Sequence, residues 1–259
     1  MMHTRLTTGL LTMLLINGLL FAADAPAPGK QVGVTFQSPT DANQKTNYLV
    51  FLPSEYGKTD QKWPLLIFLH GAGECGDNLD LVKIHGPPKL AEQRPADFPF
   101  IIVSPQAEKP KDDGPFVENW ETRKLSQLLD HLQTTYAVDT DRVYLTGLSM
   151  GGFGTLRWAA HEPKRFAAIV PVCGGGWHYY GKHLKDVPTW MFHGDQDTAV
   201  PLAFSQVVAD AIRKEGGDPK LTIYEGVGHD SWTATYNNPE VYKWLLSHKL
   251  SDRKPVEKK

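Results

Sequence analysis

Eight short apolar runs separated by helix-like segments constrain the fold of this 259-residue chain more than any other feature. From "WPLLIFLHG" onward, nearly every residue of each run is apolar, and polar residues do not alternate with apolar ones. Strands of this kind are buried on both faces, as in a parallel sheet. The runs cover Val32–Phe36, Asn47–Leu52, Pro64–His70, Phe100–Ser104, Arg142–Thr146, Phe166–Val172, Pro188–His193 and Lys220–Tyr224.

Four of the intervening segments have apolar residues at helical spacing. Strands that alternate with helices predict an α/β fold, with a mostly parallel eight-stranded sheet and helices on both faces. The first two runs precede any helical segment, so we expect these two strands to be antiparallel. The helical segments are Trp120–Tyr136, Met150–His161, Leu202–Glu215 and Glu240–His248.

The first 25 residues have the pattern of a secretory signal peptide. Met1–Arg5 carries positive charge, Leu6–Phe21 is mostly apolar, and small residues follow. The apolar run falls short of the roughly 20 residues that a membrane span needs, so we expect cleavage rather than a stable membrane anchor. The pattern allows cleavage after Ala22 or after Ala25. A secreted or periplasmic protein is predicted, with one α/β domain at 26–250 and a polar tail at 251–259.

Composition and motifs argue against several classes of partner. The net charge is −2, and Lys and Arg gather only in the short tail "SDRKPVEKK", so nucleic-acid binding is not expected. The chain has no His-x-x-x-His or Cys-x-x-Cys pair, so we expect no metal site. The glycines follow a serine motif rather than a phosphate-binding loop, so we expect no cofactor.

The stretch "VYLTGLSMGGFGT" places one serine between glycines where a strand must become a helix. At such a turn the backbone is strained, and Gly147 and Gly151 remove side chains that would collide with the neighbouring strand and helix. The hydroxyl of Ser149 is then exposed at the edge of the sheet, beside a helix N-terminus. Ser149 is therefore the candidate nucleophile.

A serine hydroxyl needs a base, and the base needs a third group that orients it. His229 is the candidate base because it follows the strand Lys220–Tyr224 in the loop "GVGHDSW". The loop "HGDQDTAVP" offers Asp195 and Asp197 as the acid, and we favour Asp197 because Asp195 more often closes the end of a strand. Two weaker alternatives for the acid are Asp230 and Glu225.

The oxyanion of an acyl-transfer intermediate needs fixed N–H donors. One predicted donor is the amide of Met150, the residue after the serine. The other is expected in the loop "HGAGE" after the strand Pro64–His70, where small residues let the backbone approach a substrate. We assign this second donor to Ala72, with Gly71 or Gly73 as alternatives.

Taken together, "HGAGECGDN", "GLSMGGFGT", "CGGG", "HGDQDTAVP" and "GVGHDSW" resemble the α/β-hydrolase superfamily. They are most similar to exported carboxylesterases and predicted peptidases related to dienelactone hydrolases, polyhydroxybutyrate depolymerase-like esterases and prolyl oligopeptidase catalytic domains. The resemblance covers about 32–248 and implies that Ser149 is the nucleophile, Asp197 the acid and His229 the base. Cys75 departs from the pattern, since relatives usually have a basic residue there.

The resemblance implies a serine carboxylesterase that works through an acyl-enzyme. The expected substrates are small-molecule or polysaccharide esters, such as acylated plant polysaccharides and phenolic or short-chain esters. A serine exopeptidase of prolyl-oligopeptidase type is the alternative with the same triad. A non-catalytic binding protein on a hydrolase fold is the alternative of another class, and the intact serine, acid, base and oxyanion loop argue against it.

Two further groups of residues lie near the predicted site. Aromatic side chains close to the site loops predict a pocket for an acyl or aryl group or a platform for sugar rings, and we assign Trp177, Trp232 and Trp120 to substrate binding. Cys75 and Cys173 follow strands that end at the same edge of the sheet, and a disulfide between them would pin the oxyanion loop. Two free buried thiols are the alternative.

Overall fold

The computed structural model describes residues 26–110 and 119–253. The predicted signal peptide at 1–25 lies outside the described residues, and so do the last six residues of the predicted tail. Residues of the tail that are described pack on the domain. Ser251 donates its hydroxyl to Asp141, and the guanidinium of Arg253 donates to the carbonyls of Asp186 and Phe166.

One eight-stranded sheet organises the chain in the order β1-β2-β4-β3-β5-β6-β7-β8. β1 pairs with β2 and β2 with β4 in antiparallel fashion, and the remaining neighbours are parallel. The strands are β1 (Gln31–Gln37), β2 (Lys45–Phe51), β3 (Trp63–Leu69), β4 (Ile101–Pro105), β5 (Val138–Leu148), β6 (Ala168–Val172), β7 (Trp190–Gly194) and β8 (Lys220–Tyr224).

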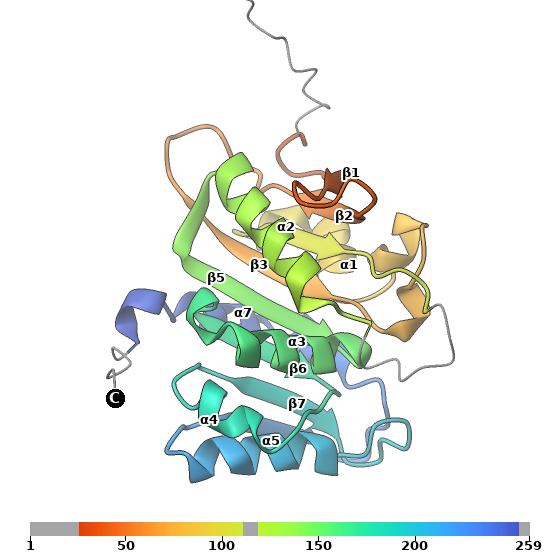
Figure 1. The fold of residues 1–259 in the computed structure, drawn as a ribbon, viewed down its shortest axis with the longest axis vertical. Helices are drawn as coiled ribbons and strands as arrows, with labels where there is room; N and C mark the ends of the chain where they lie inside the picture. The colour runs from red at the N-terminus through yellow and green to blue at the C-terminus, as the bar shows by residue number, and fades with distance from the viewer. Residues whose placement is uncertain (1–25, 111–118, 254–259) are drawn as a thin grey trace, which may run out of the picture.

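Helices cover both faces of this sheet (Figure 1). One core contains side chains of α2, α3, α4 and α5, and the core on the opposite face contains side chains of α1, α6 and α7. The helices are α1 (Gly86–Gln93), α2 (Thr122–Thr135), α3 (Met150–His161), α4 (Tyr180–Leu184), α5 (Ala203–Lys214), α6 (Trp232–Asn237) and α7 (Pro239–Leu246). Of these helices, as described, none is long and apolar enough to cross a bilayer.

The predicted fold class is confirmed, and the burial of the strands explains why the sequence indicates it. Every residue of β3, β4 and β6 is buried, as their unbroken apolar runs predict. The edge strands β1 and β8 contain exposed residues. The antiparallel start is also confirmed.

The structure adds elements that periodicity did not reveal. α1 begins Gly-Pro-Pro, and α4 and α6 are short, so none of them presents a long apolar stripe. β5 begins at Val138, earlier than the predicted Arg142, because polar residues at its start interrupt the apolar pattern. A 3-10 helix, η1 (Ala72–Glu74), also follows β3 directly.

Candidate active site

Ser149 lies between the end of β5 and the first residue of α3 and has a strained backbone. Its φ of 52° and ψ of −117° are a conformation that residues with a side chain rarely adopt. Such strain persists only where the surrounding structure holds it. The serine is therefore presented on a sharp turn at the carboxyl end of the central sheet.

The neighbouring glycines are required by close backbone contacts. A Cβ on Gly151 would lie 1.9 Å from the carbonyl oxygen of Leu69, and a Cβ on Gly147 would lie 2.4 Å from that of Gly151. Both distances are far inside van der Waals contact, and the obstructing atoms belong to the backbone. The glycines thus let α3 pack directly on the end of β3.

His229 joins the serine to the acid. Its Nε2 lies 2.9 Å from Oγ of Ser149, and its Nδ1 lies 2.7 Å from Oδ2 of Asp197. Because a carboxylate oxygen only accepts, Nδ1 carries the hydrogen and Nε2 is left to accept the hydroxyl proton of Ser149. The side chain of His229 is 27% exposed, so substrate can reach this end of the chain of hydrogen bonds.

The acid is held in place from its other side. Oδ1 of Asp197 accepts the amides of Ala199 at 3.0 Å and Val200 at 2.8 Å, and the residue is only 6% exposed. A buried carboxylate needs such donors, because burial without them is costly. The turn that follows β7 therefore fixes the carboxylate plane that orients His229.

The other acidic candidates have different partners. Asp195 accepts the amide of Gly226 at 2.8 Å, which is the strand-closing role that the sequence suggested for it. Asp230 accepts the amide and the hydroxyl of Thr233 at the start of α6, each at 3.0 Å. Glu225 is exposed. The structure therefore brings Ser149, Asp197 and His229 together and leaves these three carboxylates outside the chain of hydrogen bonds.

The predicted oxyanion donors both begin a helix. Met150 is the first residue of α3 and Ala72 the first residue of η1. The first amides of a helix have no acceptor within it, so both amides are suited to bind a developing negative charge. Met150 is buried, whereas Ala72 is exposed on the loop after β3.

The oxyanion loop, defined here as His70–Cys75, is braced by the segment that follows β4. The imidazole of His70 accepts the amide of Ala107 at 3.0 Å through Nε2 and faces the carbonyl oxygen of Gly71 at 2.6 Å through Nδ1. An accepting Nε2 requires a neutral ring with its hydrogen on Nδ1. Burial lowers the pKa of His70 to about 4, which favours that neutral form.

Gln106 and Trp120 complete the brace. The side-chain amide of Gln106 donates to the carbonyls of Glu74 and Asn78, each at 2.8 Å. The indole N–H of Trp120 donates to the carbonyl of His70 at 3.3 Å, and the ring is 3% exposed. Trp120 thus braces the oxyanion loop, and it also lines the pocket described below, so its expected role in substrate binding stays a prediction.

The other two predicted aromatic residues differ in their surroundings. Trp232 begins α6, and its ring centroid lies 5.3 Å from that of His229 in an edge-on contact. Trp177 lies in the segment between β6 and α4 and is 61% exposed. Trp232 therefore contacts the imidazole of the base, whereas the ring of Trp177 is exposed to solvent.

A buried carboxyl group in the oxyanion loop was not identified from the sequence. Glu74 lies 3.8 Å from Nδ1 of His70 and 3.9 Å from Nε2 of His85, and burial raises its pKa. The ring of His85 in turn contacts that of Trp232, with centroids 5.4 Å apart. The sequence signal for Glu74 is a charged residue among the small residues of "HGAGE".

The two cysteines are free and buried, so the disulfide considered from the sequence is absent. Cys75 belongs to the core that faces α2 and α3, whereas Cys173 belongs to the core on the opposite face of the sheet. Cys75 instead accepts a hydrogen bond from the amide of Asn119, with a nitrogen–sulfur distance of 3.7 Å. The two cysteines follow strands that end at the same edge of the sheet, but their side chains lie on opposite faces, so the sulfur atoms do not meet.

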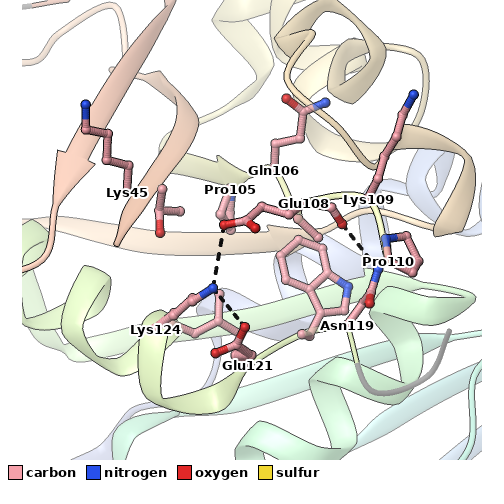
Figure 2. Close-up of a pocket in the computed structure, with 13 residues that line it drawn as sticks. Lys45, Pro105, Gln106, Glu108, Lys109, Pro110, Asn119, Glu121 and Lys124 are labelled. Atoms are coloured by element: carbon pink, nitrogen blue, oxygen red, sulfur yellow. Dashed lines mark hydrogen bonds and ion pairs between the residues drawn. The ribbon is translucent and has the colours of Figure 1, made fainter. Parts of the chain in front are cut away.

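A pocket lies beside the segment that follows β4 (Figure 2). In it Nζ of Lys124 lies 2.8 Å from Glu121 and 3.6 Å from Glu108. The residues described as lining this pocket include Trp120 but none of the three residues of the hydrogen-bonded chain. Across residues 26–110 and 119–253, no cluster of three or more His, Cys, Asp or Glu side chains is placed to hold a metal ion.

Residues 40–242 match the family model named Esterase, described as "Putative esterase". The chain belongs to this esterase family. A solved thermostable esterase is 31% identical to it, with a TM-score of 0.74, over 85% of this chain and 63% of that one. The fold is that of the α/β-hydrolase esterases.

Two curated relatives that are similar to this chain are named as esterases. The bifunctional acetylxylan esterase/xylanase XynS20E of Neocallimastix patriciarum is 29% identical over 61% of this chain and 22% of its own length. Feruloyl esterase D of Neurospora crassa is 24% identical over 98% of this chain and 92% of its own. The chain spans less than half the length of XynS20E and of a second relative, a poly(3-hydroxyalkanoate) depolymerase.

Proposed function

We propose that this chain is a serine carboxylesterase that cleaves acyl esters through an acyl-enzyme intermediate. The observation that carries the proposal is the continuous chain from Ser149 Oγ through His229 to Asp197, with contacts of 2.9 and 2.7 Å. Membership of the esterase family supports the same reaction class. No other described group supplies a nucleophile and base at hydrogen-bond distance beside a strained strand-to-helix turn.

In the first step, Oγ of Ser149 attacks the ester carbonyl while its proton passes to Nε2 of His229. Asp197 stabilises the imidazolium that results, because its Oδ2 already accepts Nδ1–H. The proton on Nε2 is then delivered to the departing alcohol, which leaves the acyl group on Ser149. Water attacks this acyl-enzyme with His229 as base and releases the acid.

The negative charge of each tetrahedral intermediate falls on the former carbonyl oxygen. The amides of Met150 and Ala72 are the proposed donors, since both are first amides of helices beside the serine. The braces from Ala107, Gln106 and Trp120 would fix the loop that carries Ala72 before substrate arrives. Fixed donors cost no reorganisation during the reaction, which makes this pre-positioning effective.

The proposed substrates are small-molecule or polysaccharide esters, such as acylated polysaccharides and phenolic or short-chain esters. The names of the relatives, an acetylxylan esterase and a feruloyl esterase, support this class. Trp232 against the base and the exposed Trp177 supply flat apolar surfaces suited to aryl or sugar rings. We further propose secretion or periplasmic export, which the mass of the mature protein would test by placing its N-terminus at residue 23 or 26.

The function is tested with a substrate panel and two serine variants. The panel contains nitrophenyl esters of rising chain length, methyl ferulate, acetylated xylan and a proline nitroanilide. Ester turnover by the wild type that is lost in Ser149→Ala and kept in Ser251→Ala, a serine on the far tail, is the expected result. Faster turnover of the anilide than of any ester would favour a peptidase. A folded wild type that neither turns over the panel nor reacts with a fluorophosphonate would overturn the proposal.

A further inference from the structure

A second imidazole contacts the acid of the proposed triad. His193, at the end of β7, is 0% exposed, and its Nε2 lies 3.3 Å from Oδ2 of Asp197. The same nitrogen lies 2.8 Å from the carbonyl oxygen of Val200. One carboxylate oxygen thus faces two histidines, because Oδ2 also accepts Nδ1 of His229 at 2.7 Å.

The acceptors around His193 determine which of its nitrogens carries hydrogen. A carbonyl oxygen and a carboxylate oxygen only accept, so Nε2 must be protonated and donates to the pair formed by Val200 and Asp197. Burial lowers the pKa of His193; the carbonyl of Val200 and the carboxylate of Asp197 oppose this shift, and the nearby His229 adds to it. A neutral His193 with its hydrogen on Nε2 fits these surroundings.

The other ring nitrogen links the acid to the nucleophile helix. Oγ of Ser205 on α5 lies 2.8 Å from Nδ1 of His193 and 2.8 Å from the carbonyl oxygen of Gly174. With the hydrogen of His193 on Nε2, both of these atoms are acceptors, so the single hydroxyl proton of Ser205 serves one of them at a time. Gly174 packs against Gly152, the third residue after the nucleophile and part of the first turn of α3, since a Cβ on Gly174 would lie 2.5 Å from the carbonyl carbon of Gly152. His193 and Ser205 therefore connect the loop of the acid to the start of α3.

Resting on the proposed function, we propose that His193 is a positioning residue for catalysis, which acts through Asp197 on the orientation of His229. Asp197 has only one described side chain other than His229 within ion-pair distance, and it is His193. The amides of Ala199 and Val200 hold Oδ1, so His193 is the group that limits rotation of Oδ2 away from His229.

Two amide variants of His193 separate positioning from simple core packing. In His193→Gln the amide nitrogen occupies about the place of Nε2 and still donates toward Val200 and Asp197. In His193→Asn the amide nitrogen reaches only the place of Nδ1, toward Ser205. A misplaced catalytic group can cost about 100-fold in rate, so we expect kcat to fall about 10- to 100-fold in the Asn variant, with KM changed less than about twofold. The Gln variant should keep kcat within about threefold of the wild type.

A role in packing alone makes a different prediction. Both variants would then lose thermal stability and activity together, with no difference between Gln and Asn well below their melting temperatures. Equal kcat values for the two folded variants would overturn the proposal. If the Asn variant does not fold, Ser205→Ala is measured in its place, because it removes the buried hydroxyl on α5 that contacts Nδ1. Unchanged kcat in Ser205→Ala together with a fully active Gln variant would then overturn the link to Gly174 and α3.

Proton NMR tests the positioning without any substrate. The Nδ1–H of His229 bonded to a carboxylate gives a far-downfield resonance, which we expect in the wild type and in His193→Gln and expect to shift or broaden in His193→Asn. The same resonance unchanged in the Asn variant would contradict the proposal. A wild type that shows this pattern but cleaves no ester would instead contradict the proposed esterase function, so the two failures are distinguishable.

Discussion

Nε2 of His229 lies 2.9 Å from Oγ of Ser149, although 80 residues separate them in the chain. Parallel strands end at the same edge of a sheet, so the loops after β5, β7 and β8 meet there. The sheet thus supplies the geometry of the site, and each loop needs to carry only one reactive side chain. This arrangement makes the contribution of each residue measurable by substitution.

The three residues should behave as one unit. We expect Ser149→Ala and His229→Ala each to lower kcat by roughly 10⁴-fold or more, because each removes the proton path to the nucleophile. The double variant should lose little beyond the single variants, since neither residue acts without the other. Steady-state kinetics on one nitrophenyl ester measures this, and strictly additive losses would argue that the two residues act independently.

Gly151 should tolerate no side chain. The Cβ of Gly151→Ala would meet the backbone oxygen of Leu69 at 1.9 Å, so β3 and α3 would have to separate. We expect a loss of about 1–3 kcal/mol in the free energy of unfolding, or more, together with a large loss of activity. Gly73→Ala is the matched control for stability, because its Cβ has no neighbour within 4 Å. Urea unfolding that ranks the two variants equally would contradict this account.

The protein should lose stability as the pH falls below neutrality. Burial lowers the pKa of His70 to about 4 in the folded state, below the ordinary value of about 6.5, so between these values the unfolded chain binds more protons. Stability that is fully present above pH 6.5 is therefore lost as the pH falls toward 4. The loss from this residue is about 3 kcal/mol. Burial also lowers the pKa of His193, so this residue adds to the loss of stability at low pH.

Urea unfolding at pH 7 and at pH 4.5 checks this prediction. Comparing the wild type with His70→Gln isolates the contribution of His70 from that of the other titrating groups. We expect the variant to show a smaller change between the two pH values. An equal change in both proteins would indicate that the buried ring of His70 does not control the acid sensitivity.

The sheet and the chain of hydrogen bonds could be predicted because both follow from where each strand lies in the sequence. The apolar runs mark buried strands, and the residue after each run marks the edge where the loops meet. No comparable pattern in the sequence indicates which way a side chain in a loop points. Trp120 and Trp177 are both aromatic residues near site loops, yet one is buried under the oxyanion loop and the other is 61% exposed. For the same reason the sequence did not reveal that His193 contacts Asp197.

The two tryptophans give the last prediction. Trp120→Phe removes the hydrogen bond to the carbonyl of His70, so we expect a lower melting temperature and a lower kcat for every ester alike. Trp177→Ala removes an exposed ring, so the melting temperature and the turnover of short-chain esters should stay unchanged. Its KM for methyl ferulate or acetylated xylan should rise, because the proposed stacking surface is lost.

These outcomes also decide where substrate binds. A rise in KM for aryl esters in Trp120→Phe, with stability intact, would support the assignment of Trp120 to substrate binding and direct attention to the pocket beside it (Figure 2). An unchanged KM in Trp177→Ala for every member of the panel would remove Trp177 from that group. Trp232, whose ring meets His229 edge-on, would then be the aromatic residue left to contact the acyl or aryl group of the ester.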